Sequence, residues 1–363
     1  MKNIFNNNLN KKNSYLNKSN NKVNSVNKNK KGINNKNFIN NDFNINIDLK
    51  NSNNSNKIEI SKKSFKDSLK NYSIPFFKKR EFQFIKIIGQ GSFGKIYLVK
   101  EIKENKEYAV KIIYCKGYYE LLKYLEEFEF LYKISNDNII KVYKYNIVEK
   151  ELSSLLTELY LYLLMEKAEC DWEQEIEKRR KNKQYYTVEH LFLILNQLVS
   201  GLTFLQENKI AHRDIKPQNI LIFPQNIYKI TDLGEAKMNL NLKNEKQKQT
   251  FVGSELFMSP LLYNGLRQNK NRISHNPFKS DVYSLGLCFL YAITLNLNVI
   301  KLIRELKYLK NKEDLIKRNV KDLPKYPHIL WGIVFKMLEY EEKNRYDFIE
   351  LGKHLPKFNY EKY

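Results

Sequence analysis

The chain has 363 residues, of which 42% are hydrophobic and 13% aromatic, and it carries a formal net charge of +23. This length allows one large domain or two ordinary ones, and the apolar content is sufficient for a sizeable core. Cys115, Cys170 and Cys288 lack short spacing, which argues against a disulfide framework or a metal knuckle and indicates a reducing compartment, the cytoplasm or the nucleus.

The N-terminal segment differs in composition from the rest of the chain. Asn accounts for 23 of the first 56 residues, and apolar residues occur singly, so residues 1–75 are predicted to be a disordered tail. Through Ser73 there are 15 Lys and 4 acidic residues, so weak contact with nucleic acid or an anionic membrane surface is one hypothesis. A coding bias toward A and T explains the same composition, and we favour it. The opening "MKNIFNNNLN" lacks the apolar region of a secretory signal.

From Glu81 the pattern becomes that of a small, mostly antiparallel sheet with one helix. The segments 82–89, 95–101, 107–115, 139–148 and 159–168 are rich in β-branched and aromatic residues, and 119–134 has apolar residues at helical spacing. This β-rich lobe is expected to end near Lys167. From residue 187 the chain reads as largely helical, with two short strands at 220–223 and 228–231 and a long polar segment up to Pro260. A β-rich lobe followed by a helical lobe suggests a cleft between them.

Two further stretches of the second lobe each allow two interpretations. The apolar run 283–303 approaches the length of a membrane span, but it contains two Asn and follows Asp281, so a buried core helix is the better interpretation and no transmembrane segment is predicted. The basic run "KRRKNK" at 178–183 could be a nuclear import signal, but a solvated surface loop is favoured.

A glycine-rich loop lies between the first two predicted strands. Gly89, Gly91 and Gly94 have the G-x-G-x-x-G spacing, which lets backbone N–H groups approach a phosphate. A dinucleotide-binding turn shares this spacing but requires a helix after the last glycine. Because "KIYLVK" has strand character, a flap between two strands is favoured.

A lysine lies inside the third predicted strand. Lys111 is bracketed by Val110 and Ile112, so it either faces solvent on an alternating strand or requires an anionic partner. The following helix offers Glu127 as that partner, with Glu126 and Glu129 as rivals.

The polar stretch "AHRDIKPQNIL" (211–221) decides among these alternatives. With "KITDLG" (229–234) it resembles the catalytic and metal-binding loops of eukaryotic protein kinases, and the glycine-rich loop, the strand lysine and the helix glutamate match the same family in the same order. The resemblance covers about residues 81–356, and it implies an α+β bilobal fold with an N-lobe at 81–167 and a C-lobe at 168–356.

The resemblance assigns roles to the polar residues. Asp214 corresponds to the residue that accepts the substrate hydroxyl proton, and Lys216, which is typical of serine/threonine kinases, to the cation that neutralises the moving phosphoryl group. Asn219 and Asp232 correspond to Mg²⁺ ligands. Lys111, held by Glu127, would bind the α and β phosphates of ATP. The nucleotide would also contact Ile88, Gly89, Gly91, Gly94, Ile96, Ala109, Met165, Glu166, Ala168 and Leu221.

Among the structural residues, His212 is expected to lie in the core that spans both lobes. Asp281 corresponds to the residue that braces the catalytic loop, and Arg345 to a buried arginine near the end of the domain. Two positions depart from the family: Leu233 replaces the usual Phe of the metal loop, and Leu261 replaces the Glu that pairs with the arginine at 345. A buried arginine without that carboxylate is costly unless another acid substitutes.

A regulatory role is implied for the polar segment before Pro260. Thr250, three residues before Gly253, matches the family's activating phosphosite, with Arg213 and Lys237 as the cationic groups that receive the phosphate. The alternative is an ordinary exposed threonine.

The sequence therefore predicts a serine/threonine protein kinase that uses ATP and Mg²⁺ and acts on protein substrates. The competing hypothesis is a pseudokinase that binds nucleotide and serves as a scaffold.

Overall fold

The computed structural model describes residues 77–91, 94–153, 156–237, 247–250, 252–305, 312–320 and 322–356. The predicted disordered tail, residues 1–75, lies outside this part of the chain. The first described residue, Phe77, is buried: its N–H donates to the Tyr145 carbonyl at 3.0 Å and its ring packs edge-on against Phe82. Phe77, four residues before Glu81, is thus part of the packed domain.

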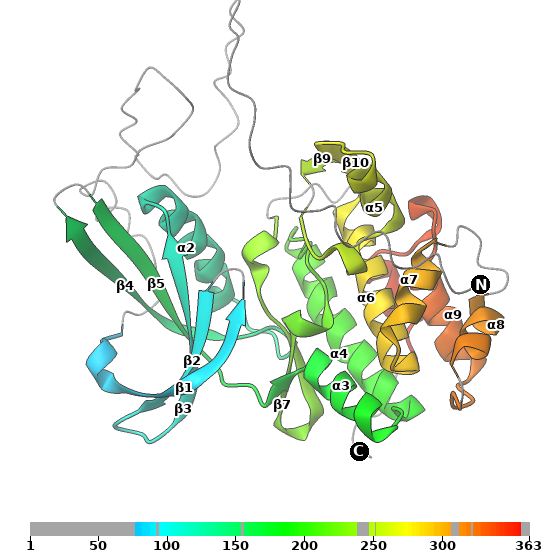
Figure 1. The fold of residues 1–363 in the computed structure, drawn as a ribbon, viewed down its shortest axis with the longest axis horizontal. Helices are drawn as coiled ribbons and strands as arrows, with labels where there is room; N and C mark the ends of the chain where they lie inside the picture. Colours follow the sequence, from blue (N-terminus) through cyan, green and yellow to red (C-terminus); the bar gives the residue numbers. More distant parts are fainter. Residues whose placement is uncertain are drawn as a thin grey trace, which may run out of the picture. The chain divides into compact units, whose positions relative to one another are not determined.

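The N-terminal part is one antiparallel sheet with a helix beside it (Figure 1). Helix α2 (Tyr118–Lys133) packs against β3, β4 and β5 and buries Leu121, Leu125 and Phe128. The strands are β1 (Phe82–Gly91), β2 (Gly94–Glu101), β3 (Glu107–Cys115), β4 (Val142–Ser153) and β5 (Leu156–Met165), in the order β1-β2-β3-β5-β4. Their β-branched and aromatic residues fit this pleated, half-buried surface, so the predicted sheet with one helix is confirmed.

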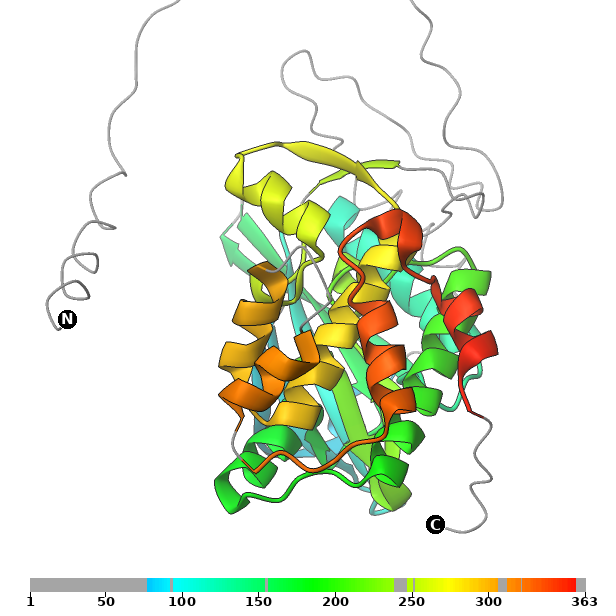
Figure 2. The same ribbon diagram turned by 90° about the vertical axis from the view of Figure 1, so that its right-hand side faces the viewer.

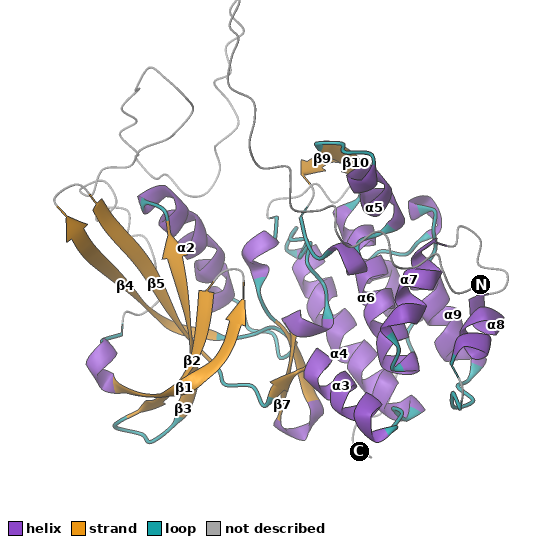
Figure 3. Ribbon diagram, viewed as in Figure 1, coloured by secondary structure: helices purple, strands orange, loops and turns teal. Residues whose placement is uncertain are grey.

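The C-terminal part is mostly helical (Figure 3). Its helices are α3 (Trp172–Asn182), α4 (Val188–Glu207), α5 (Pro260–Arg267), α6 (Pro277–Thr294), α7 (Leu297–Glu305), α8 (Lys312–Asn319), α9 (His328–Met337) and α10 (Phe348–His354). The turned view of Figure 2 shows α7 and α9 alongside α6, with which both make contact. The fold is therefore α+β with a β-rich and a helical lobe, as predicted.

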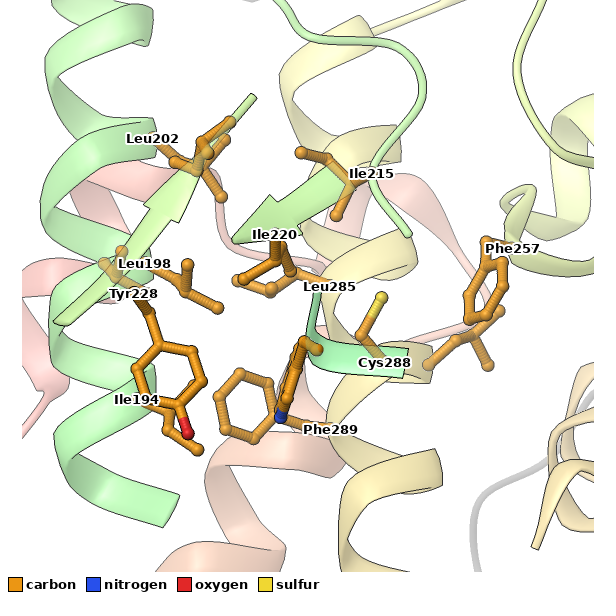
Figure 4. Packing of buried hydrophobic residues seen from close by; sticks show 14 of the residues in the cluster. Ile194, Leu198, Leu202, Ile215, Ile220, Tyr228, Phe257, Leu285, Cys288 and Phe289 are labelled. Carbon is orange, nitrogen blue, oxygen red and sulfur yellow. The ribbon is translucent and has the colours of Figure 1, made fainter. Parts of the chain in front are cut away.

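Helix α6 forms the centre of the helical lobe. All its residues from Ser280 to Thr294 are buried, and Figure 4 shows Leu285 and Phe289 packed with Ile194 and Leu198 of α4. The first part of the apolar run 283–303 is thus a buried core helix, α6, which ends at Thr294. Leu295 follows with a left-handed backbone conformation (φ 51°), and the rest of the run belongs to α7. Only α4, among the described helices, is long and apolar enough to cross a membrane, and half of that stretch is buried inside the protein.

Short strands lie between the helices and place the site residues. Strands β6 (Cys170–Asp171), β7 (Ile220–Phe223) and β8 (Ile227–Ile230) form one small sheet, and β9 (Gln247–Thr250) pairs with β10 (Arg272–His275). One loop prediction is wrong. Residues 178–182 of the basic run form the end of helix α3 instead of a loop. The ion pair of Arg179 with Glu175 at 2.9 Å, four residues earlier, and the acidic first turn both favour a helix here.

Candidate active site

Strands β1 and β2 are joined by the glycine-rich loop, of which the tip, residues 92 and 93, lies outside the described residues. Gly94 has φ +140°, and a Cβ atom there would lie 1.8 Å from the Ile112 carbonyl oxygen. Only glycine fits this position. A strand rather than a helix follows Gly94, so the geometry is that of a flap between strands and not of a dinucleotide-binding turn.

The residues expected around a nucleotide base come from both lobes. Ala109 of β3 is paired with Met165 of β5, and both side chains are buried. Leu221 of β7 lies in the helical lobe, and Ile88 of β1 is 41% exposed. The Glu166 N–H already donates to the Lys141 carbonyl at 3.3 Å, so its carbonyl remains as a candidate partner for a base.

The Glu166 side chain joins the two lobes. Its carboxylate accepts from the Lys141 N–H at 2.9 Å and from Lys229 Nζ of β8 at 2.8 Å. The sequence pointed only to the backbone of Glu166, because the pairing with Lys229 bridges 63 residues of chain. This ion pair fixes the chain segment between β5 and β6.

The loop between α4 and β7 gathers polar groups around Asp214. One Asp214 oxygen accepts from the Ser254 N–H at 2.8 Å and hydroxyl at 3.0 Å, and the other from Lys216 Nζ at 2.7 Å and Asn219 Nδ2 at 3.0 Å. Lys216 also donates to the Ser254 hydroxyl at 2.9 Å. Burial opposes ionisation of Asp214, but the hydrogen bond and charge of Lys216 outweigh it and hold the pKa of Asp214 below its usual value.

Helix α6 braces this loop through Asp281. The two Asp281 carboxylate oxygens accept from the His212 N–H at 2.8 Å and the Arg213 N–H at 2.9 Å, which supports the left-handed conformation of Arg213 (φ 68°). Burial raises the pKa of Asp281 to about 7, while the two backbone donors oppose this shift. The buried His212 ring donates through Nε2 to the Thr231 carbonyl at 2.9 Å, which links the loop to the residue that follows β8. Asp281 thus braces the loop, and His212 is buried beside it.

The metal loop contacts the strand lysine directly. Asp232 has a left-handed backbone (φ 63°), and its Oδ1 lies 2.8 Å from Lys111 Nζ. The Glu127 carboxylate of α2 is buried, and its Oε1 atom has no hydrogen-bond partner among the residues that the structure describes. Burial raises the pKa of Glu127 to about 8, against the opposing charge of Lys111. In this conformation the lysine is therefore paired with the metal-loop carboxylate.

The two candidate metal ligands present oxygen atoms of the type that Mg²⁺ prefers. Asn219 is buried and donates its amide N–H groups to the Asp214 carbonyl at 2.8 Å and carboxylate at 3.0 Å, which leaves its amide oxygen for a cation. Asp232 supplies a carboxylate. A hard cation fits this oxygen set.

The residues predicted to receive a phosphate from Thr250 lie close to one another. Ala211 and Lys237 exchange backbone hydrogen bonds of 3.1 and 3.0 Å, so Lys237 lies beside the catalytic loop that carries Arg213. Burial and the charges of Arg213 and Arg272 lower the pKa of Lys237. Thr250 pairs with Arg272 across β9 and β10, while its side chain lies outside what the structure describes. Arg272 was not predicted, because its closeness to Thr250 depends on a strand pairing without a local sequence signal.

The arginine near the end of the domain has replacement partners for the missing carboxylate. Arg345 is 2% exposed; its N–H groups donate to the carbonyls of Glu339 (2.6 and 3.0 Å), Lys279 (2.9 Å) and Tyr340 (3.2 Å), and its guanidinium lies over the Tyr283 ring at 4.8 Å. Among the residues that the structure describes, no acidic side chain forms an ion pair with Arg345 in place of the Glu expected at Leu261. Backbone carbonyls and one aromatic face take its place instead.

The comparisons with known proteins agree with this geometry. The family model of the protein kinase domain matches residues 82–355, which is more than half of the chain. The chain belongs to the protein kinase family.

Similar kinases share about 30% of their residues with this one. A calcium-dependent protein kinase 4 of Plasmodium berghei is 28% identical over 243 residues, covering 63% of this chain and 41% of its own length. The serine/threonine-protein kinase atg1 of Dictyostelium discoideum is 31% identical over 210 residues, covering 56% of this chain and 28% of its own length. An Aurora kinase of Eremothecium gossypii is 27% identical over 280 residues, covering 76% of this chain and 69% of its own length. The chain thus spans less than half the length of the first two relatives.

Proposed function

We propose that this kinase transfers the γ-phosphate of ATP to serine or threonine hydroxyl groups of protein substrates, with Mg²⁺. The observation that carries the proposal is the arrangement around Asp214. Its carboxylate is ionised at neutral pH, as the lowered pKa requires, and Lys216, Ser254 and Asn219 hold it in place. A positioned carboxylate of this kind can accept the proton of a substrate hydroxyl.

Each of the other groups has a matching task. Lys216 would move from Asp214 toward the transferring phosphoryl group, and Lys111 would bind the α and β phosphates. Asp232 and Asn219 would hold Mg²⁺, which when bound neutralises phosphate charge. Ile88, Ile96, Ala109 and Leu221 would enclose the adenine, with Met165 behind it.

Catalysis requires a rearrangement at Lys111. The Asp232 oxygen that now contacts Lys111 is needed for the metal, so Lys111 would turn to Glu127 when nucleotide and metal bind. Glu127 is buried with an oxygen lacking a hydrogen-bond partner, so it offers an acceptor for that exchange. The same Lys111–Asp232 contact is the observation that favours the competing proposal, a nucleotide-binding scaffold without phosphotransfer.

The test combines activity with binding. The full chain is incubated with a peptide array, γ-labelled ATP and Mg²⁺, and nucleotide binding is followed by the rise in melting temperature. We expect labelled phosphoserine or phosphothreonine from the wild type, and from Asp214→Asn no label but an unchanged nucleotide-induced shift. A shift without any labelled peptide would instead favour the scaffold, and label retained by Asp214→Asn would refute the assigned base.

A further inference from the structure

A groove runs along one face of α4. Its larger cavity, of about 880 Å³, lies between α4, the turn joining β7 and β8, and the connection that precedes β4. A second cavity of about 410 Å³ lies between α4 and the end of α10. Asn196 and Ser200 line both cavities, so the two adjoin. We call this surface the α4 groove, defined by Leu193, Asn196, Ser200, Phe204, Ile227 and Leu355.

The walls of the larger cavity are fixed by internal hydrogen bonds. Asn138 Nδ2 donates to the Tyr228 carbonyl at 3.0 Å and to Gln197 Oε1 at 3.3 Å. The Tyr228 N–H donates to the same Gln197 oxygen at 2.6 Å, and the Ile230 N–H to the Asn138 carbonyl at 2.9 Å. These bonds tie α4 to β8 and to the connection after α2. The groove is therefore preformed, which lowers the entropic cost of binding a segment.

The chain itself leads into this groove. Leu355, directly after α10, lines the smaller cavity, and the chain continues from Pro356 as "KFNYEKY" (357–363). From Phe204 to Leu193 the helix rises about 16 Å at 1.5 Å per residue, whereas seven extended residues span about 23 Å. The segment is thus long enough to reach the larger cavity.

The chemistry of segment 357–363 matches the groove. Its apolar groups, Phe358, Tyr360 and Tyr363, would meet Leu193, Phe204 and Ile227, which are partly exposed. Its Lys357 and Lys362 would meet carboxylates of the lining. Those carboxylates are Asp137, Glu189 and Glu207.

The lysine in the groove lining does not repel the lysines of segment 357–363. Lys229, a lysine that lines the larger cavity, is already paired with Glu166 at 2.8 Å. The side chains of the segment include two lysines and one glutamate, so their net charge is opposite to that of the lining carboxylates.

We propose that residues 357–363 dock in the α4 groove and thereby bridge α4, α10 and the connection that follows α2. A segment tethered two residues from its site has an effective concentration of about millimolar, so it outcompetes a second copy of the chain or another protein of ordinary affinity. Because the connection at Asn138 leads from α2, which carries Glu127, occupancy of the groove would also restrict movement of that helix.

The test places a photoreactive benzoylphenylalanine at Tyr360 in the full chain and maps the cross-links by mass spectrometry. We expect intramolecular cross-links to the α4 residues between Leu193 and Phe204 or to Ile227. Ser200→Trp fills the junction of the two cavities and should abolish these cross-links. The matched control, Gln174→Trp, is an equally exposed helical position on α3, outside the groove, and should leave them unchanged.

Mixing isotopically heavy and light chains separates the possible occupants. Cross-links within one copy at the stated residues support the proposal. Cross-links between heavy and light copies, cross-links to other surfaces, or none in the wild-type background would overturn it. Because the wild-type map alone is decisive, the outcome does not depend on whether Ser200→Trp folds.

Discussion

Arg345 provides the most quantitative prediction, because every partner of its guanidinium is visible. Replacing it by Met removes the donors to the partly buried carbonyls of Glu339 and Lys279 and the cation from the Tyr283 ring. A buried polar group that loses its partner costs roughly 1–3 kcal/mol, and removal of the buried charge recovers part of that cost. We expect Arg345→Met to lower the free energy of unfolding by about 3 kcal/mol.

For a domain of this size, 1 kcal/mol corresponds to a change in melting temperature of about 2 °C, so the expected loss is about 6 °C. Calorimetry or circular dichroism of the full chain measures it. Leu261→Glu, which restores the family's usual acid, serves as the matched control. It should change the stability by less than about 1 kcal/mol, because carbonyls already occupy the Arg345 donors. An unchanged melting temperature for Arg345→Met, or a large gain from Leu261→Glu, would refute this reasoning.

Four further predictions concern activity and boundaries. Asp232→Asn should abolish magnesium-dependent phosphate transfer while unfolding stays cooperative; near wild-type turnover would contradict the metal role. Because the folded-state pKa of Glu127 lies near 8 and the unfolded value near 4.5, this group stabilises the fold below about pH 4.5 and loses that effect as the pH rises toward 8. Glu127→Gln should remove that pH dependence from melting curves and reduce turnover. An unaltered pH dependence of the melting temperature would argue against the raised pKa of Glu127. After treatment with ATP, Thr250→Ala and Arg272→Ala should each lower activity, with little further loss in the double variant; full activity of dephosphorylated Thr250→Ala enzyme would exclude the switch. A chain beginning at Tyr72 should melt and turn over peptide as the full chain does, and a large drop in melting temperature would show that the tail contributes to the fold.

The order of local motifs was sufficient to predict the family and the fold class. Each motif lies within a short segment of sequence and can be identified there. The motifs are the glycines at 89, 91 and 94 followed by a strand, the lysine in β3, and the polar loop around Asp214. The same is true of the strands of the N-terminal sheet and of the buried α6. The periodicity of apolar side chains and the need for glycine at particular backbone conformations act over a few residues, so both can be predicted without a structure.

The partners of charged side chains were decided only by the tertiary structure. Lys111 and Asp232 are 121 residues apart in sequence, so their ion pair depends on how β3 and the metal loop are brought together by the fold. Arg345 finds carbonyls where the sequence suggested a missing acid, and Arg272 lies opposite Thr250 because β9 and β10 pair. Such pairings are set by how separate elements pack, and the energy of a buried charge depends on every group that packing brings within a few ångströms. Composition and spacing therefore determined which chemical groups this kinase carries, and the fold determined which of them meet.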